Sequence, residues 1–214
     1  MLEVGGRALT PQRIFCVGRN YAEHAKEMGG TPPAEPVIFM KPATSLVAEG
    51  QALTLPRGLG SVHHEMELVA ILGSAGRDIA PAAALRHVAG LSLGIDLTLR
   101  DLQTKLRQAG EPWELSKAFD GSAALGRFTP WPARFDVQAL EMHCSVDGAS
   151  RQRGNTRDMI FPLAAIISFL SRSWRLLPGD LIYTGTPAGV GPLKPGECIE
   201  IACPELGSFR WRCA

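Results

Sequence analysis

The sequence predicts an α+β fold in which strands dominate the second half of the chain. Its 214 residues are 45% hydrophobic and 20% charged, which is ordinary for a folded globular chain and unlike a disordered one. Twenty-three glycines and 16 prolines divide the sequence into short segments and indicate many turns. No internal repeat, low-complexity tract or linker separates these segments. We therefore expect a single domain over residues 1–214.

In the first half of the chain, short apolar runs alternate with helical segments. Each expected helix has a start signal: Asn20 as an N-cap, Pro81 at a first helical position, and Thr98-x-x-Asp101 as a capping box. Gly29-Gly30 ends the first helix, and the proline-rich segment after it predicts a mobile surface loop. Strands are expected at residues 13–17, 37–40, 62–72 and 90–97, and helices at residues 19–28, 81–88 and 98–110.

In the second half, alternating apolar and polar residues predict strands. The clearest case is Leu140, Met142, Cys144 and Val146, which alternate with polar residues up to Asp147-Gly148, the strongest hairpin signal in the sequence. Beyond this hairpin we expect a buried helix at residues 159–171 and strands near residues 181–184, 198–202 and 208–212.

Charge and cysteine content exclude several classes of function. Lys and Arg number 22 against 21 Asp and Glu, so we expect neither a nucleic-acid nor a membrane partner. Five scattered cysteines without a C-x-x-C pair argue against a zinc knuckle or a disulfide framework and suit a reducing cytosol. Residues 1–13 lack the apolar segment of a secretory signal, and the apolar run at residues 159–170 is too short to span a bilayer. The expected location is cytoplasmic.

The segment His63-His-Glu-Met-Glu67 is the most informative part of the sequence. On an extended strand, Glu65 and Glu67 project from one face roughly 7 Å apart, and they repel unless a cation or a proton lies between them. Asp96 lies in an otherwise apolar strand, where an unpaired charge is costly. If Asp96 meets the two glutamates, the three form an all-oxygen site that suits Mg²⁺ or Mn²⁺ rather than zinc. The alternative is that the two glutamates form the solvated end of a strand.

His24 and Glu27 form a second candidate cluster. At i, i+3 on one helix face, the carboxylate can orient the imidazole and raise its basicity. A solvated ion pair is the commoner outcome of this spacing. The neighbouring glycines and proline-rich loop suggest that the helix opens and closes as a lid.

Further polar residues follow Asp96 along the chain. Arg100 and Gln103 share a helix face and could both point back towards the metal. Lys117 is a single charge in a mostly apolar stretch, which is equally compatible with a lysine that reaches the surface. The glycine-rich residues 184–191 lack the ending of a nucleotide-binding P-loop, and they predict a tight loop whose backbone N–H groups could hold a carboxylate.

Six motifs occur together in a characteristic order between Phe15 and Gly191. They are Val17-Gly-Arg-Asn-Tyr-Ala-Glu-His24, Phe39-Met-Lys-Pro42, His63-His-Glu-Met-Glu67, Gly94-Ile-Asp-Leu-Thr-Leu-Arg-Asp101, Lys117-Ala-Phe119 and Thr184-Gly-Thr-Pro-Ala-Gly-Val-Gly191. In this order they resemble the fumarylacetoacetate hydrolase family, especially its short single-domain members that resemble acylpyruvate hydrolases.

The resemblance implies a mixed β-sandwich roll with a few short helices, usually as a homodimer. It implies Mg²⁺ or Mn²⁺ bound by Glu65, Glu67 and Asp96, and a water-activating His24–Glu27 dyad on a lid. Lys117 is then catalytic, and the residues expected to bind substrate are Arg19, Tyr21, Arg100, Gln103 and Thr186. The larger fumarylacetoacetases have a fourth acidic ligand, which residues 17–19 here do not offer. This difference favours smaller, acylpyruvate-type substrates.

The function expected first is therefore metal-dependent hydrolysis of a carbon–carbon bond in a small 2,4-dioxo acid such as fumarylpyruvate or acetylpyruvate, which releases pyruvate and a carboxylic acid. Three alternatives stay open. The same metal site could decarboxylate or tautomerise oxaloacetate without an attacking water, or isomerise unsaturated 2-oxo dioic acids. A divalent-cation-binding module without turnover is the non-enzymatic alternative.

Overall fold

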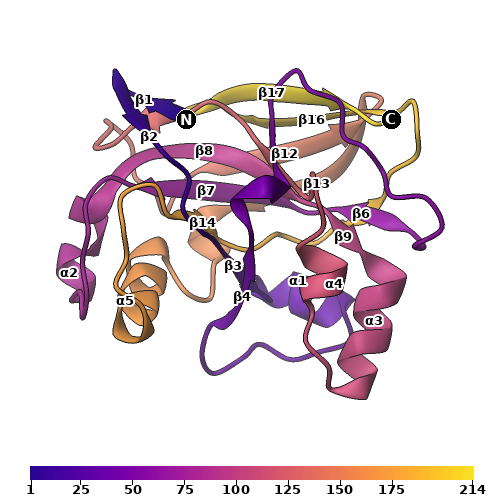
Figure 1. Cartoon of the computed structure of the whole chain (residues 1–214), viewed down its shortest axis with the longest axis horizontal. Coiled ribbons are helices and arrows are strands. Elements are labelled where there is room, and N and C mark those ends of the chain that lie inside the picture. The colour runs from indigo at the N-terminus through magenta and orange to yellow at the C-terminus, as the bar shows by residue number, and fades with distance from the viewer.

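The computed structural model describes residues 1–214 as two layers of β-sheet with short helices against one side (Figure 1). The larger sheet has the strand order β4-β3-β14-β7-β8-β10-β5, and β11 pairs with β8 beside β10. Its strands are β3 (Ile14–Gly18), β4 (Val37–Lys41), β5 (Leu46–Ala48), β7 (Met66–Leu72), β8 (Val88–Asp96), β10 (Ala123–Leu125), β11 (Thr129–Pro130) and β14 (Leu181–Tyr183).

The second layer is a four-stranded antiparallel sheet that lies above β7 and β8 in the view of Figure 1. In sheet order its strands are β13 (Ala149–Asn155), β12 (Glu141–Val146), β16 (Cys198–Cys203) and β17 (Gly207–Arg212). Two small sheets complete the β-structure: β15 (Gly191–Pro192), β6 (Val62–His64) and β9 (Thr98–Leu99) form one, and β1 (Leu2–Val4) and β2 (Arg7–Leu9) form the other.

The helices gather in two groups, which lie below β7 and β8 in the view of Figure 1. One group contains α1 (Ala22–Glu27), α3 (Arg100–Ala109) and α4 (Glu114–Lys117), and the other contains α2 (Pro81–Ala84) and α5 (Leu163–Ser173). Three 3₁₀ turns are at Ala43–Ser45, Leu85–His87 and Thr156–Asp158. No helix is both long enough and apolar enough to cross a membrane.

Strand β7 is buried along its whole length because its two faces pack into different cores. Met66 and Leu68 belong to the main core, which lies between the two sheets and also receives α5, whereas Val69 belongs to a smaller core on the other face. Alternation along the strand puts the side chain of Glu67 on the same face as Val69. The Glu67 carboxylate therefore lies at one end of the smaller core.

The hairpin predicted at Asp147-Gly148 is confirmed. Strands β12 and β13 pair antiparallel with Val146 opposite Ala149. Both turn residues have left-handed backbone angles, φ 48° at Asp147 and φ 78° at Gly148, as a tight two-residue hairpin requires. All five cysteines are free, in agreement with the expectation from their spacing.

Several expected boundaries are wrong because tertiary contacts recruit the residues that would have capped the helices. Asn20 does not cap α1; its buried side-chain amide donates to the carbonyls of Phe161 and Thr184. The capping box at Thr98 is absent too, since its hydroxyl bonds the Asp96 carbonyl and α3 begins only at Arg100. Three further elements differ from the expectation. The strand expected at residues 62–72 is interrupted at Glu65, the α-helix that begins at Pro81 ends at Ala84, and the helix expected from residue 159 begins only at Leu163.

Candidate active site

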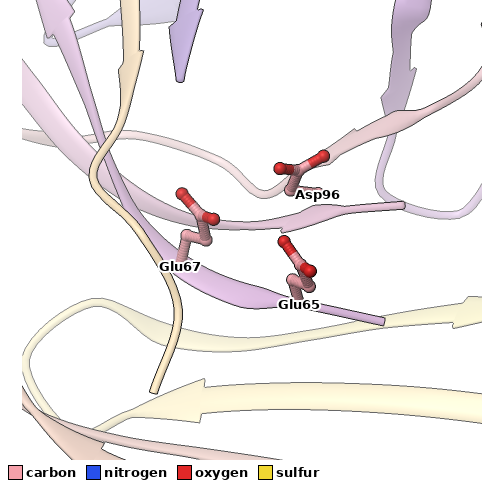
Figure 2. A group of neighbouring side chains, drawn as sticks. All are labelled: Glu65, Glu67 and Asp96. Atoms are coloured by element: carbon pink, nitrogen blue, oxygen red, sulfur yellow. The ribbon is translucent and has the colours of Figure 1, made fainter. Parts of the chain in front are cut away.

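Three buried carboxylates meet at one end of the smaller core, as the sequence indicated (Figure 2). One oxygen from each of Glu65, Glu67 and Asp96 lies within 4.8 Å of the others. Glu67 lies opposite Gly94 in the β7–β8 pairing, so Asp96 is its diagonal neighbour on the same face. Glu65 lies in the break before β7, and its carbonyl accepts the Asp96 N–H at 2.8 Å. Register and this single backbone bond bring the three side chains together.

Gly94 allows this arrangement because the position directly across from Glu67, on the same face of the sheet, has no room for a side chain. A Cβ at Gly94 would lie 2.6 Å from the ring of Tyr183 and 2.7 Å from the carbonyl oxygen of Ala124. The glycine within the motif around Asp96 is thus a packing requirement of the sheet beside the site.

The carboxylates have opposite electrostatic environments. Burial and the charges of Asp96 and Glu65 raise the pKa of the Glu67 carboxyl well above its ordinary value. Burial also raises the pKa of Glu65, but Lys117 and Arg100 outweigh it and hold that pKa below its ordinary value. Of the two glutamates, Glu67 is therefore the one whose neutral form these surroundings favour.

The donor set fits a divalent cation of the Mg²⁺ or Mn²⁺ type. All three side chains offer hard carboxylate oxygens, the ligands that Mg²⁺ and Mn²⁺ prefer, and one oxygen from each lies within 4.8 Å of the others. The buried Asp96 Oδ1 accepts no hydrogen bond, and its charge is balanced by the Lys41 ammonium 2.8 Å away. A buried carboxylate oxygen without a hydrogen-bond donor can take a metal ion as a partner.

Lys117 lies in the centre of the cluster and does not extend to the surface. Its Nζ lies 2.7 Å from each of Glu65 Oε2, Asp96 Oδ2 and Thr98 Oγ1. Burial alone lowers the pKa of this ammonium, but the charges of Asp96 and Glu65 outweigh it and hold the pKa above its ordinary value. These surroundings favour the charged form of Lys117, which is suited to stabilise negative charge on a bound molecule.

A second buried lysine, Lys41, was not singled out as a site residue. It ends β4, and its Nζ donates to the carbonyls of Leu97 and Lys117 and to both the carbonyl and the hydroxyl of Ser122. Its Nζ also lies 2.8 Å from Asp96 Oδ1, with which it forms a buried ion pair. Lys41 therefore balances the charge of Asp96. A lone lysine at the end of an apolar strand, inside the motif at residues 39–42, was the signal available in the sequence.

Replacing Lys41 by Met is expected to lower the free energy of unfolding by about 3–5 kcal/mol, because it removes one partner of a buried ion pair together with the hydrogen bonds that Lys41 donates to backbone carbonyls. Urea unfolding of the metal-free protein measures the change. The exposed Lys194, replaced by Met as a control, should change stability by less than about 0.5 kcal/mol. A loss of under about 1 kcal/mol in Lys41→Met would contradict this role for the ion pair.

His24 and Glu27 form the expected pair on α1. His24 Nδ1 lies 3.1 Å from Glu27 Oε2, and the other Glu27 oxygen accepts the N–H of Gly189 at 3.1 Å. Gly189 cannot be replaced without moving this loop, since a Cβ there would lie 2.3 Å from the Arg151 carbonyl oxygen. The imidazole is buried and lines the same chamber as the carboxylates. Because Nδ1 is taken by Glu27, Nε2 is the nitrogen free to exchange a proton with a ligand.

The glycine-rich loop does hold a carboxylate, and it is one of the chain's own. Gly185 N–H donates to Glu67 Oε2 at 2.7 Å. Thr186 donates its hydroxyl to the Met66 carbonyl and accepts from the buried amide of Gln152. The sequence reading missed Gln152, which gives no distinctive signal in β13. Together these bonds fix the loop against β7.

The residues expected to bind substrate separate into two groups. Arg100 donates to Glu65 Oε1 at 2.5 Å and to Gln103 Oε1 at 2.6 Å, so the side chains of Arg100 and Gln103 on α3 both point towards the carboxylates. Arg19 and Thr186 also line the chamber. Tyr21 does not: it is buried in the main core and its backbone pairs with Met159.

The site consists of a small inner chamber and a wide outer one. The inner chamber, about 30 Å³, contains the three carboxylates, His24 and Lys117. The outer chamber, about 590 Å³, has Glu27 and Glu111 in its wall. The two chambers share four lining residues: Arg19, Met28, Arg107 and Trp113. The sequence reading missed Arg107, although it lies seven residues after Arg100 and so on the same helix face.

Comparison with known proteins agrees with this geometry. A family model described as the C-terminal part of fumarylacetoacetate (FAA) hydrolase matches residues 13–214. The chain belongs to the fumarylacetoacetate hydrolase family. Its mixed sheet with few short helices is the fold of that family, as the resemblance implied.

Three members of the family show how close the relationship is. The oxaloacetate tautomerase YcgM of Escherichia coli (strain K12) is 46% identical over 191 residues, covering 88% of this chain and 87% of the relative. The mitochondrial oxaloacetate tautomerase FAHD1 of Mus musculus is 43% identical, with coverage of 94% and 91%. The crystal structure of fumarylpyruvate hydrolase from Pseudomonas aeruginosa, in complex with Mn²⁺ and pyruvate, superposes with a TM-score of 0.94 at 42% identity and covers 100% of this chain and 94% of that one.

Proposed function

We propose that the protein catalyses the metal-dependent keto–enol tautomerisation of oxaloacetate. The observation that carries the proposal is the similarity, over about nine-tenths of both chains, to two relatives named oxaloacetate tautomerase. It favours an alternative left open by the sequence over the acylpyruvate hydrolysis expected first. The residues of the site support either reaction, because both pass through an enolate next to a carboxylate.

The arrangement of the site suits enolisation. Glu65, Glu67 and Asp96 would hold the divalent cation, which supplies a Lewis acid for the carboxylate and 2-oxo oxygens of the substrate. His24 Nε2 takes a proton from C3, and the electrons of the broken C–H bond form the C2–C3 double bond and leave negative charge on the 2-oxygen. Glu27 orients the imidazole and stabilises its charged form. Lys117 stabilises the negative charge on the 2-oxygen until that oxygen takes up the proton, which gives the enol. No water is consumed.

Acylpyruvate hydrolysis is the second candidate, and a specific observation favours it. The Pseudomonas aeruginosa structure of this fold is named a fumarylpyruvate hydrolase. The His24–Glu27 pair could equally deprotonate a water that attacks the remaining carbonyl. Decarboxylation of oxaloacetate would break the C3–C4 bond and leave the enolate of pyruvate, which the same cation can stabilise without a base.

These reactions can be separated in one set of assays. With Mg²⁺ or Mn²⁺, we expect the protein to accelerate exchange of the C3 protons of oxaloacetate in D₂O, followed by NMR, by at least tenfold more than it accelerates pyruvate and carbon dioxide release. Fumarylpyruvate and acetylpyruvate are assayed in parallel for pyruvate. Pyruvate release from either acylpyruvate with a kcat/KM above that of exchange would select the hydrolase instead.

We further propose that residues 1–214 act as one catalytic domain in a cytoplasmic homodimer. The family resemblance supports the dimer, and five free cysteines agree with a reducing compartment. The mouse relative is named mitochondrial, so the compartment is tested directly by cell fractionation and the dimer by light scattering.

A further inference from the structure

Two arginines at the junction of the chambers have no acidic partner. Neither Arg19 nor Arg107 has a carboxylate oxygen within 4.0 Å, although Arg100 beside them is paired with Glu65 at 2.5 Å. Arg107 donates only one long bond, 3.4 Å, to the Met28 carbonyl. Arg19 lies over the ring of Trp113, 5.9 Å from its centre. The guanidinium groups therefore face the space between the chambers with most of their donors unused.

The local charge balance makes an anion the expected occupant. Partial burial and the positive charges of Arg19 and Arg100 lower the pKa of Arg107. Two carboxylates also line the outer chamber, but Glu27 is engaged by His24 and Gly189, and Glu111 pairs with neither arginine. Like charges held together without a partner are costly to the folded protein, and such an arrangement is typical of a ligand site.

The size of the inner chamber places the two ends of a substrate. The inner chamber is much smaller than the outer one, about 30 Å³ against about 590 Å³. A substrate whose carboxylate and 2-oxo group lie beside the three acids therefore extends past Arg19 and Arg107 into the outer chamber. A guanidinium binds a carboxylate there through two parallel hydrogen bonds.

We propose that Arg107, assisted by Arg19, binds a second carboxylate at the far end of the substrate and so selects dicarboxylic 2-oxo acids over monocarboxylic ones. This inference rests on the proposed function, which it deepens. It assigns a charge partner to the C4 carboxylate of oxaloacetate. It also predicts that acetylpyruvate, whose far end is a neutral methyl ketone, is a poor ligand.

A matched pair of unreactive ligands tests the proposal without turnover. L-Lactate and L-malate share a 2-hydroxy acid that chelates a divalent cation, and they differ only in that malate has a second carboxylate. Calorimetric titration of the Mn²⁺-loaded protein should give a Kd for malate at least about 10-fold below that for lactate. Arg107→Gln should weaken malate binding by about 10- to 100-fold and leave the Kd for lactate within about twofold.

Three further variants complete the design. Lys105→Gln removes the same charge from the exposed face of α3 and should change neither affinity. Arg19→Gln should weaken malate binding in the same direction as Arg107→Gln, and Arg107→Lys, which keeps the charge but not the two-pronged geometry, should have an intermediate affinity for malate. With oxaloacetate, Arg107→Gln should raise KM far more than it lowers kcat.

The outcomes are distinct. Equal affinity of the wild-type protein for lactate and malate, or an equal loss of both in Arg107→Gln, would overturn the second-carboxylate site. A protein that prefers malate through Arg107 but does not enolise oxaloacetate would leave this site standing and remove the tautomerase proposal.

Discussion

Glu67→Gln is expected to remove divalent-cation binding and to lower turnover by at least about 10³-fold. The cation is assigned several kcal/mol of transition-state stabilisation, and each factor of ten corresponds to about 1.4 kcal/mol. The substitution replaces one of three carboxylate ligands with a neutral amide of the same shape. The carbonyl oxygen of that amide can still accept the Gly185 N–H that now binds Glu67, so the loop should remain in place.

Thermal melting separates this effect from a failure to fold. Burial and neighbouring acids raise the pKa of Glu67 and so favour the neutral form of its side chain in the metal-free protein, and glutamine imitates that form. The two metal-free proteins should therefore melt within a few degrees of each other at neutral pH. At Mn²⁺ 100-fold above its Kd, the wild type should gain about 2.7 kcal/mol of stability and the variant almost none.

The pH dependence of the metal-free proteins follows with a definite sign. A carboxyl group whose pKa is higher in the folded than in the unfolded protein stabilises the fold at pH values below its unfolded pKa. This contribution to stability is lost as the pH rises from the unfolded pKa to the folded pKa. The wild type should lose stability through this range, and Glu67→Gln should lose less. Glu141→Gln, at the exposed start of β12, is the matched control and should behave as wild type in both experiments. A Mn²⁺-induced stabilisation of normal size in Glu67→Gln would remove Glu67 from the metal site.

The carboxylate cluster shows what sequence patterns can and cannot predict. Alternation was enough to put Glu65 and Glu67 on one face, and the cost of burying an unpaired charge made Asp96 a candidate. The pattern contains no information on which strand lies beside which. Only the β7–β8 register, with Glu67 opposite Gly94, shows that Asp96 meets the other two.

The errors have a common physical cause. Asn20 and Thr98 are good helix caps by residue type, but neither caps a helix here. The Asn20 amide donates to backbone carbonyls more than 140 residues away, and the Thr98 hydroxyl accepts from Lys117 in the site. Lys41 was missed for the complementary reason. Its role is set by Asp96, Ser122 and Lys117, which lie 55 or more residues away along the chain and come together only in the folded sheet.

The pattern of residues in the sequence does not distinguish among the possible reactions. Hydrolysis, decarboxylation and tautomerisation can all use a cation held by the same acidic triad. The three reactions differ in whether a base must move a proton. The assignment therefore depends on His24 and on what lies beyond it towards Arg107, where substrates of different length and charge are distinguished.

His24→Ala is expected to lower the rate of oxaloacetate tautomerisation by about 10²–10⁴-fold, the usual contribution of a positioned base. The imidazole is the group of the inner chamber that can accept a proton from carbon, since Lys117 is held as a cation and the carboxylates face the metal position. Glu27→Gln should act in the same direction but less severely, because the imidazole remains and loses only its orienting charge. Exchange of the C3 protons in D₂O measures both variants.

Decarboxylation measured on the same variants identifies the step that His24 serves. Loss of carbon dioxide from oxaloacetate needs stabilisation of the enolate but no base, so His24→Ala should retain relatively more of this activity, whereas Glu67→Gln should lose both activities. Mn²⁺ affinity should stay within a few-fold of wild type in both dyad variants, since neither side chain belongs to the acidic cluster. His143→Ala, which removes a histidine of β12 bonded to Ser150, is the control for loss of an imidazole elsewhere. If tautomerisation and decarboxylation fall in equal proportion in His24→Ala while Mn²⁺ binding is intact, the imidazole does not act as the base for C3, and its role is to place the substrate for every reaction of the enolate.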